Sequence, residues 1–501
     1  MHRRAVALVS ILFGAALALA LAPNDATAAP ERGRCGTLER IPAAADKPRP
    51  AVSFAVAGPG AKLTRDSIGT GYQVRTSDNF AVKWTGAPVT EADATRILAA
   101  LEESWTFFLD ELGHSLPTGG ATYRMNVYVG DATDTPDIDF EGGYTDLDTE
   151  GYPYIVLHED LLDPSYEETL LRHIVVHEFY HDVQYSIDAY WDEPAWWYWE
   201  ATAEWATQVL YSDEVDAFLY IGAYALAPEV PLFYFGDVLD DELLGSYQYG
   251  ASLFTLFISE ELADRTVIRE SWETAASEDD PIVVLDELLG GGIDDAFAAH
   301  AAHNALWDYA VGDHVIAGVE TFEEWYPGTS PITDRVDANG TDGLTGARVE
   351  TLPGAYGYNV IEITRPVDGV LRVAVEADAA GSSGTPARAT ASLVRGTTTG
   401  IEYLPVGTAA GDDPVEVAME ANEPVAYLVV AVAADTRSNS EKFGYRFSVG
   451  SDDAPPIDPP DDDDDGGCGC TVGASPRAPA TPLLLLLGLL AVRLRFRLRA
   501  R

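Results

Sequence analysis

The spacing of hydrophobic residues predicts that the first half of the chain mixes helices and strands. Residues 89–112 carry apolar side chains at helical spacing, whereas residues 123–129 and 152–157 show strand patterns. A helix beginning within residues 163–165 follows the second strand, and another begins near Pro194. The predicted buried side of the first helix consists of Ile97, Leu98, Leu101, Trp105, Phe108 and Leu109.

The pattern changes in the second half. Helical spacing continues through residues 249–262, 283–289 and 294–311. From about residue 349, short β-branched runs are separated by Gly, Pro and Asp, which is typical of an all-β sandwich. The predicted fold class is therefore α+β with a mainly helical second half, followed by an all-β sandwich domain. The runs predicted as strands are 359–364, 369–376, 389–394, 415–418 and 425–433.

The predicted organisation places two folded domains between processing segments. The first residues have a basic start, an apolar core and a small-residue cleavage site, which indicates a secretory signal peptide. The predicted parts are the signal peptide at 1–28, a leader or propeptide at 29–66, the mixed helix–strand domain at 67–340, the sandwich at 345–450, an Asp/Pro-rich stalk at 451–467 and a sorting tail at 468–501.

Charge and cysteine content limit the classes of partner. The formal charge is −50, and this argues against nucleic-acid binding because phosphate contacts need clustered Lys and Arg. Such an acidic surface suits a salty external medium or calcium binding. The chain has 3 cysteines, Cys35, Cys468 and Cys470, so no disulfide framework is expected.

The end of the chain has a three-part pattern. Cys468 and Cys470 lie in a Gly-Cys-Gly-Cys run, an apolar stretch follows over residues 478–492, and alternating arginines come last. This pattern resembles the MYXO-CTERM tail of myxobacterial surface proteins. The resemblance implies export, a rhomboid- or CAAX-like sorting protease acting near Cys468 or Cys470, membrane contact through the tail, and an outer-surface location, anchored or released. A permanent inner-membrane anchor is the alternative.

Two stretches carry the candidate metal chemistry. The run His-Glu-Phe-Tyr-His covers residues 177–181, and on a helix His177 and His181 are one turn apart on the same face. Both imidazoles can reach one small cation, and Glu178 is placed to take a proton from a metal-bound water. Glu200 lies on the next predicted helix and would complete three protein ligands with a fourth position open, as in catalytic zinc sites.

This spacing, HExxH followed after eighteen residues by Glu, resembles the gluzincin metallopeptidases, the thermolysin and aminopeptidase-N-like clan. The resemblance implies a zincin catalytic domain, zinc bound by His177, His181 and Glu200, and Glu178 as general base. Glu204 matches the place of an acid that hydrogen-bonds a ligating imidazole. An exposed helix carboxylate is the alternative for both Glu200 and Glu204.

Metzincins, the competing zincin group, have Gly three residues after the second His and another His three residues later. This chain has Gln184 and Ile187 at those places. Cys35 faintly resembles the propeptide cysteine that blocks zinc in metzincins. Because the metzincin spacing is absent, a latency switch at Cys35 is a hypothesis and not the expected role.

A second element, Tyr-x-x-Gly, also resembles aminopeptidase-N-like gluzincins, in which the tyrosine donates a hydrogen bond to the oxyanion. By position that role falls on Tyr247, with Tyr249 as the alternative. The Gly-x-Met-Glu-Asn-like element that captures a free amino terminus is absent from the sequence, which favours endopeptidase over aminopeptidase action. Strand 154–157 is the predicted substrate platform through β-augmentation, and a fully buried strand is the alternative.

Other acidic and histidine positions are weaker candidates. Residues 131–151 form a carboxylate-rich loop that could hold Ca2+, although a solvated loop explains the same residues. His173 lies too far along the helix to share the ion and is expected to be packed or partly exposed. His300 and His303 are expected to be core or surface residues, and a transition-state donor is the alternative for either.

The sequence thus predicts a secreted, cell-surface-anchored zinc metalloendopeptidase that hydrolyses protein or peptide substrates. The alternatives are a surface adhesion or binding protein built on an inactive zincin scaffold, and an aminopeptidase. Degeneration usually removes a ligand or the general base, and His177, Glu178, His181 and Glu200 are all present.

Overall fold

The computed structural model describes residues 34–37, 40–45, 47, 62–66 and 68–450, the last with gaps at 87, 135, 141, 164–167, 193–194, 237–241, 339–344, 347–350, 365–368 and 420–424. These residues lie in the first of two compact units, Met1–Ile457. The predicted signal peptide, stalk and sorting tail lie outside the described residues. Within the described part, no helix has the length and apolar character that membrane crossing requires.

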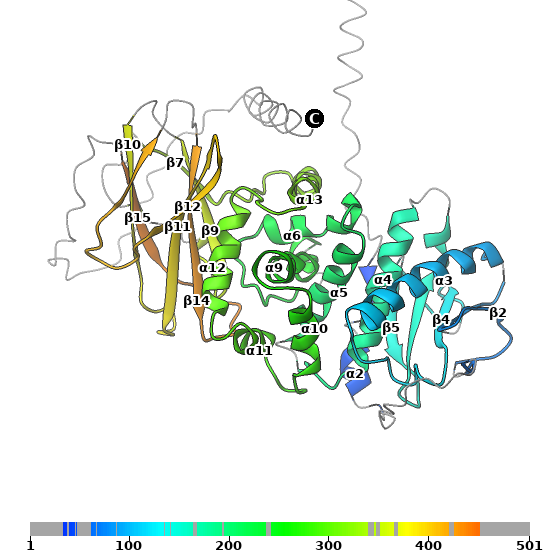
Figure 1. The fold of residues 1–501 in the computed structure, drawn as a ribbon. Helices are drawn as coiled ribbons and strands as arrows, with labels where there is room; N and C mark the ends of the chain where they lie inside the picture. Colours follow the sequence, from blue (N-terminus) through cyan, green and yellow to red (C-terminus); the bar gives the residue numbers. More distant parts are fainter. Residues whose placement is uncertain are drawn as a thin grey trace, which may run out of the picture. The chain divides into compact units, whose positions relative to one another are not determined.

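A six-stranded mixed sheet carries the first part of the fold (Figure 1). β3, β4 and β6 are parallel, β5 is antiparallel to β6, and β1 is parallel to β5. The strands, in spatial order, are β1 (Arg34–Cys35), β5 (Gly142–Leu147), β6 (Pro153–His158), β4 (Met125–Gly130), β3 (Phe80–Trp84) and β2 (Gln73–Thr76).

The sheet order overturns the predicted substrate platform. β6, which contains residues 154–157, pairs with β4 on one side and with β5 on the other. A strand with both edges paired has no backbone groups left for a peptide, so the platform prediction is wrong and the buried-strand alternative is correct. Next to β6 lies β5, and the outer edge of β5 is covered by the short strand β1, which is the last strand at this end of the sheet.

Two helices, α3 (Glu91–Trp105) and α4 (Glu168–Tyr185), pack over one face of the sheet (Figure 1). The side chain of Thr90 accepts a hydrogen bond from Asp93 N, and the Asp93 carboxylate accepts one from Thr90 N, so a capping box starts α3. All six apolar residues predicted for this helix are buried, and a π-helical turn continues it over Thr106–Glu111. The predicted start of α4 at residues 163–165 lies partly outside the described residues.

The middle of the chain is helical, as its spacing predicts. α5 (Trp196–Leu210) is buried on most sides because Trp197, Trp199 and Trp205 are all fully enclosed. The other helical elements are α2 (Ile41–Ala45), η3 (Glu159–Leu162), η5 (Val215–Phe218), α6 (Ile221–Ala225), α7 (Glu242–Gly245), α8 (Tyr247–Gly250), α9 (Ser252–Phe257), η6 (Ile258–Leu262), α10 (Thr266–Glu273), α11 (Pro281–Leu288), α12 (Ile293–Asn304) and α13 (Gly312–Trp325).

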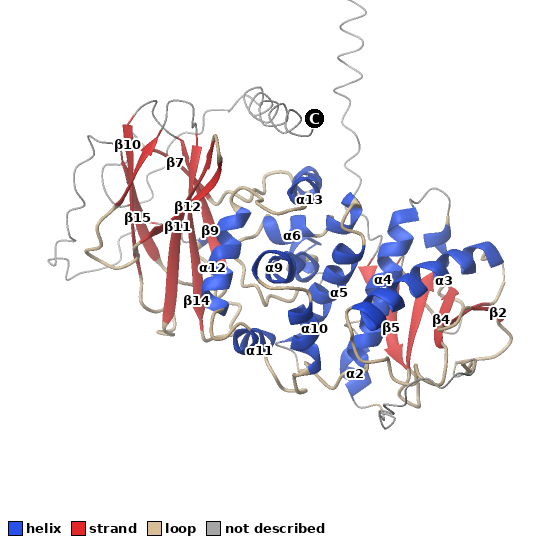
Figure 2. Cartoon of the chain, in the orientation of Figure 1, coloured by secondary structure: helices blue, strands red, loops and turns tan. Residues whose placement is uncertain are grey.

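Two further antiparallel-rich sheets follow and share an apolar core (Figure 2). One has the order β13-β10-β15-β8 and the other β12-β11-β14-β9-β7. All five predicted strands are present, and α12 packs against β14 and β11. The strands are β7 (Asp334–Asp337), β8 (Thr345–Gly346), β9 (Gly357–Thr364), β10 (Gly369–Ala377), β11 (Ala387–Thr397), β12 (Gly400–Val406), β13 (Val415–Met419), β14 (Val425–Ala434) and β15 (Tyr445–Gly450).

Two segments predicted to be irregular contain regular elements among their described residues. The carboxylate-rich loop at 131–151 contains β5, and the leader at 29–66 contains β1 and α2. Gly143 explains why α4 approaches β5 so closely. A Cβ atom at Gly143 would lie 2.8 Å from Cγ of Glu178 and 3.0 Å from Cγ2 of Ile174.

We therefore expect Gly143→Ala to push α4 away from β5. The expected loss is about 1–3 kcal/mol of unfolding free energy, the usual cost of overpacking, measured by urea denaturation. Gly396→Ala in β11 is the matched control, since a Cβ there meets no atom within 4 Å. Equal stability of the Gly143→Ala variant and the wild type would contradict the close packing of α4 on β5.

Candidate metal centre

The helix α4 brings two imidazoles together one turn apart. The ring centroids of His177 and His181 are 4.8 Å apart, and their Nε2 atoms are 3.1 Å apart. Val176, Phe179 and Val183 on the same helix are buried in the core and fix its rotation. Both imidazoles therefore point to one side of α4, towards α5.

The helix α5 supplies a carboxylate to the same point. Oε2 of Glu200 lies 2.9 Å from Nε2 of His177 and 3.7 Å from Nε2 of His181. Glu200 is fully buried, and its Oε1 atom has no hydrogen-bond partner among the described residues. The indole nitrogen of the neighbouring Trp199 donates to Tyr190 O over 2.8 Å, which helps to hold α5 in this rotation.

A fourth residue reaches the cluster from the N-terminal segment. Sγ of Cys35 lies 3.4 Å from Nε2 of His181, and the ligand atoms of Cys35, His177, His181 and Glu200 all lie within 4.8 Å of one another. All four residues are buried. Four side chains of these types in such a group can bind a metal ion.

Two polar residues lie behind the imidazoles. Gln184 donates its amide N–H groups to Trp199 O and Thr202 Oγ1, so its Oε1 faces Nδ1 of His181 over 2.5 Å. This acceptor favours a proton on Nδ1 of His181, which leaves its Nε2 as a lone-pair donor. Nδ1 of His177 lies 3.1 Å from Oε1 of Glu204 but has no hydrogen-bond partner among the described residues.

The positions of the four ligand-type atoms fit a cation. The two Nε2 atoms lie 3.1 Å apart, and a carboxylate oxygen and a sulfur lie against them. A cation between these atoms would stabilise their burial together. A tetrahedral ion with nitrogen ligands at about 2.0–2.1 Å sets those nitrogens about 3.3 Å apart, close to the observed separation.

The charges of the ligands depend on their burial and neighbours. Burial alone would raise the pKa of Glu200, but His181 and His177 hold that pKa down at about 2, so the group is a carboxylate. Burial raises the pKa of the Cys35 thiol well above its usual range, and Glu178 and Glu200 add to this effect. A bound cation would act in the opposite direction and favour the thiolate.

Glu178 lies beside the ligands and is held by two hydroxyl groups. Its Oε2 atom accepts hydrogen bonds of 3.0 Å from Thr37 Oγ1 and from Thr145 Oγ1. Thr145 is in β5, and Thr37 follows β1 in the N-terminal segment. Sequence reasoning missed both threonines because they lie far from the HExxH run along the chain.

Of the two candidate tyrosines, Tyr249 lies near the cluster and Tyr247 does not. Tyr247 donates its hydroxyl to Val230 O over 2.8 Å and packs on Tyr224 and Tyr234, so it is not brought to the cluster. Tyr249 lies there: its ring is 6.0 Å from that of His177, and its hydroxyl donates to Cys35 O over 3.4 Å.

Tyr220, at the start of α6, is a further group near the cluster that sequence reasoning missed. Its ring lies 5.2 Å from that of Tyr249. Burial raises the pKa of Tyr220 above its usual range, and the nearby Glu204 carboxylate adds to the shift.

The remaining histidines are engaged elsewhere. Nε2 of His173 lies 2.8 Å from Glu214 Oε2. The buried His300 ring is hydrogen-bonded to the hydroxyl groups of Tyr224 and Tyr309. The His303 ring stacks on Tyr403. In the part of the chain that the structure describes, the four-residue cluster is the one group of three or more His, Cys, Asp or Glu residues suited to a metal ion. The described residues of 131–151 thus show no calcium cluster.

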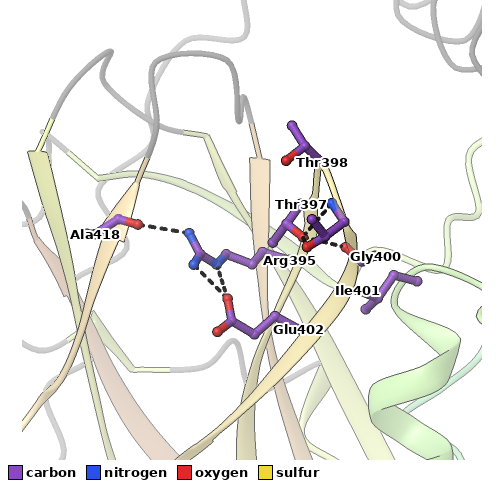
Figure 3. A pocket seen from close by; sticks show the side chains of 8 residues that line it. Arg395, Thr397, Thr398, Gly400, Ile401, Glu402 and Ala418 are labelled. Carbon is purple, nitrogen blue, oxygen red and sulfur yellow. Dashed lines mark hydrogen bonds and ion pairs between the residues drawn. The ribbon is translucent and has the colours of Figure 1, made fainter.

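A hollow on the sandwich offers no comparable chemistry. It lies at the turn between β11 and β12, next to β13 (Figure 3). Arg395 is its basic residue, and its guanidinium is paired with Glu402 at 2.6 Å and donates to Ala418 O over 2.9 Å (Figure 3). The charge is thus neutralised within the sheet.

Comparison with known families places the cluster in a wider context. Residues 65–442 match the model of DUF6055, which is described as a family of unknown function. The chain belongs to this family. The DUF6055 match includes His177, His181 and Glu200, whereas Cys35 precedes it. No curated protein matches the chain.

We expect Gln184→Ala to weaken metal binding about 10–100-fold, the usual effect of losing a group that orients a ligand. The variant frees His181 to change tautomer while every ligand remains. Zinc affinity is measured by competition with a chromogenic chelator. Gln208→Ala, which removes another buried glutamine that donates to Ser252, is the control and should retain wild-type affinity.

Proposed function

We propose that this protein is a zinc-dependent endopeptidase with a gluzincin-like catalytic domain. The observation that carries the proposal is the convergence of His177, His181 and Glu200 from two packed helices, with Glu178 beside them. This donor set, two imidazoles and a carboxylate, is typical of catalytic zinc.

Three side chains would hold the zinc ion, and two further side chains lie behind the imidazoles. When bound, zinc supplies Lewis-acid polarisation of a carbonyl group and lowers the pKa of a water molecule. His177 and His181 would hold it through Nε2, with Glu204 and Gln184 behind them, and Glu200 would hold it through its carboxylate. The buried Oε1 of Glu200, which has no hydrogen-bond partner among the described residues, fits a role as a cation ligand.

Glu178 is the proposed general base and acid. Its carboxylate takes the proton of the attacking water and later delivers that proton to the leaving amine nitrogen of the peptide. Thr145 donates to Oε2 from β5 and fixes the rotamer of Glu178. Gly143 makes room for this arrangement because a side chain there would collide with Glu178.

Tyr249 is the proposed donor to the oxyanion that forms on the scissile carbonyl. Its hydroxyl already contacts a backbone carbonyl, that of Cys35, next to the cluster. Tyr247, the residue assigned by motif position, is bound to Val230 O instead. A preorganised hydroxyl of this kind contributes about 2.7–4 kcal/mol to lowering the barrier in comparable sites.

The substrates proposed are extended protein chains. The proposed binding place is the outer edge of β5, next to Glu178, where a peptide would pair as an added strand in place of β1. Endopeptidase action is favoured over aminopeptidase action since the sequence lacks the Gly-x-Met-Glu-Asn-like element. Export and surface anchoring through Cys468 or Cys470 remain predictions from the terminal segments.

Glu178→Gln tests the proposal. We expect it to keep one zinc per chain and to lose casein hydrolysis by about 10²–10⁴-fold or more, because the amide cannot accept the proton. The full-length chain and fragment 67–450 are assayed with casein and with amino-acid amides, with and without a chelator. Glu214→Gln, at a partly buried acid that pairs with Arg172 and His173 away from the metal cluster, is the control.

Comparable casein hydrolysis by Glu178→Gln and the wild type would refute the general-base assignment. Zinc-dependent release from amino-acid amides with no cutting of casein would favour an aminopeptidase. No hydrolysis by any form would favour a binding protein on an inactive scaffold.

A further inference from the structure

The N-terminal segment lies along the sheet edge that a peptide substrate would need. β1 pairs with β5 in parallel, with Arg34 opposite Gly142 and Cys35 opposite Gly143. The amide of Gly36 donates to Gly143 O over 2.9 Å and extends the pairing. An open strand edge is a template for an extended chain, and here the protein's own chain fills it.

The same short segment engages three groups of the proposed active site. Sγ of Cys35 lies 3.4 Å from Nε2 of His181, and Thr37 Oγ1 donates to Glu178 over 3.0 Å. The carbonyl of Cys35 accepts the hydroxyl of Tyr249 over 3.4 Å. A ligand position, the general base and the oxyanion donor are thus all occupied by residues 35–37.

Side-chain contacts also hold the segment on the outer side of β5. The Arg40 guanidinium lies 3.4 Å from the centre of the Tyr144 ring, and Ile41 and Ala44 of α2 are buried in the main apolar core. Lys47 pairs with Asp146 at 2.7 Å. The segment also precedes the DUF6055 match, which begins at residue 65 and contains the other three ligands. It therefore stands outside the part of the chain that defines the family.

We propose that residues 34–37 are a built-in occupant of the peptide-binding edge of β5, with Cys35 as a displaceable fourth metal ligand. The metal site is closed while this segment is in place, and an extended peptide enters along β5 once the segment has left. This inference rests on the proposed function. A permanent four-ligand structural site, which is the usual role of a fully protein-coordinated zinc, is the competing explanation.

Ligation by Cys35 is tested in the full-length chain with Cys468→Ser and Cys470→Ser, so that Cys35 is the sole thiol. Loading with cobalt(II) should give thiolate-to-cobalt charge-transfer absorption, and adding Cys35→Ser should remove it while one cobalt per chain remains. Zinc should slow alkylation of Cys35 by iodoacetamide at least about tenfold. Equal alkylation with and without zinc, together with no charge-transfer band, would overturn the inference.

Displacement is tested by trypsin cleavage after Arg40 and by binding of a fluorescent extended peptide. Both should be weak in the zinc-loaded chain and strong in Cys35→Ser. Thr37→Val, which keeps the thiol, should increase alkylation of Cys35, whereas the sandwich variant Thr397→Val should not. If Cys35→Ser loses zinc, or keeps the trypsin resistance and excludes the peptide, Cys35 is a fixed structural ligand and the inference fails.

These measurements do not depend on turnover. If no form cleaves casein while the cobalt band, the zinc protection and the peptide binding follow the expected pattern, the proposed protease function fails but the occupancy of β5 by residues 34–37 stands. If casein is cleaved equally well by the zinc-loaded wild type and by Cys35→Ser, the protease function stands and the inference fails.

Discussion

The structure depends on a buried arrangement that a positive charge would stabilise. Two imidazoles, a fully buried carboxylate and a sulfur converge within 4.8 Å. Around this point α4, α5 and β1 meet, although they lie far apart in the sequence. The tryptophans of α5, the glutamine behind His181 and the glycine in β5 all hold these elements in that arrangement. A bound cation would crosslink the helices and the sheet at this point.

The sequence revealed the parts of this centre that follow local rules. His177 and His181 share a helix face because of their spacing of four, and Glu200 follows on the next helix at a recognisable distance. Thr37, Thr145 and Cys35 contribute through long-range strand pairing, for which no local spacing exists. Their position could be learned only from the sheet order.

Other differences between prediction and structure have similar physical causes. The acidic residues around β5 suggested a loop, but Gly143 lets the strand pack tightly under α4. Tyr247 and Tyr249 lie two residues apart on one short helix and so face different directions. A motif match locates the functional tyrosine only to within one helical turn. The packing of the helix decides which of the two hydroxyl groups lies near the four-residue cluster.

The parallel pairing of β1 with β5 has a consequence for how the protein would compete with its substrates. A segment tethered in the same chain acts at an effective concentration of about millimolar, whereas a passing substrate must compete at its bulk concentration. Weak contacts are then enough to hold the segment in place. Once the backbone is cut between residue 37 and the family domain, the segment no longer has this high effective concentration. The released peptide then dissociates and is diluted into the solution. Opening by such a cut would therefore act as a one-way event in the life of each molecule.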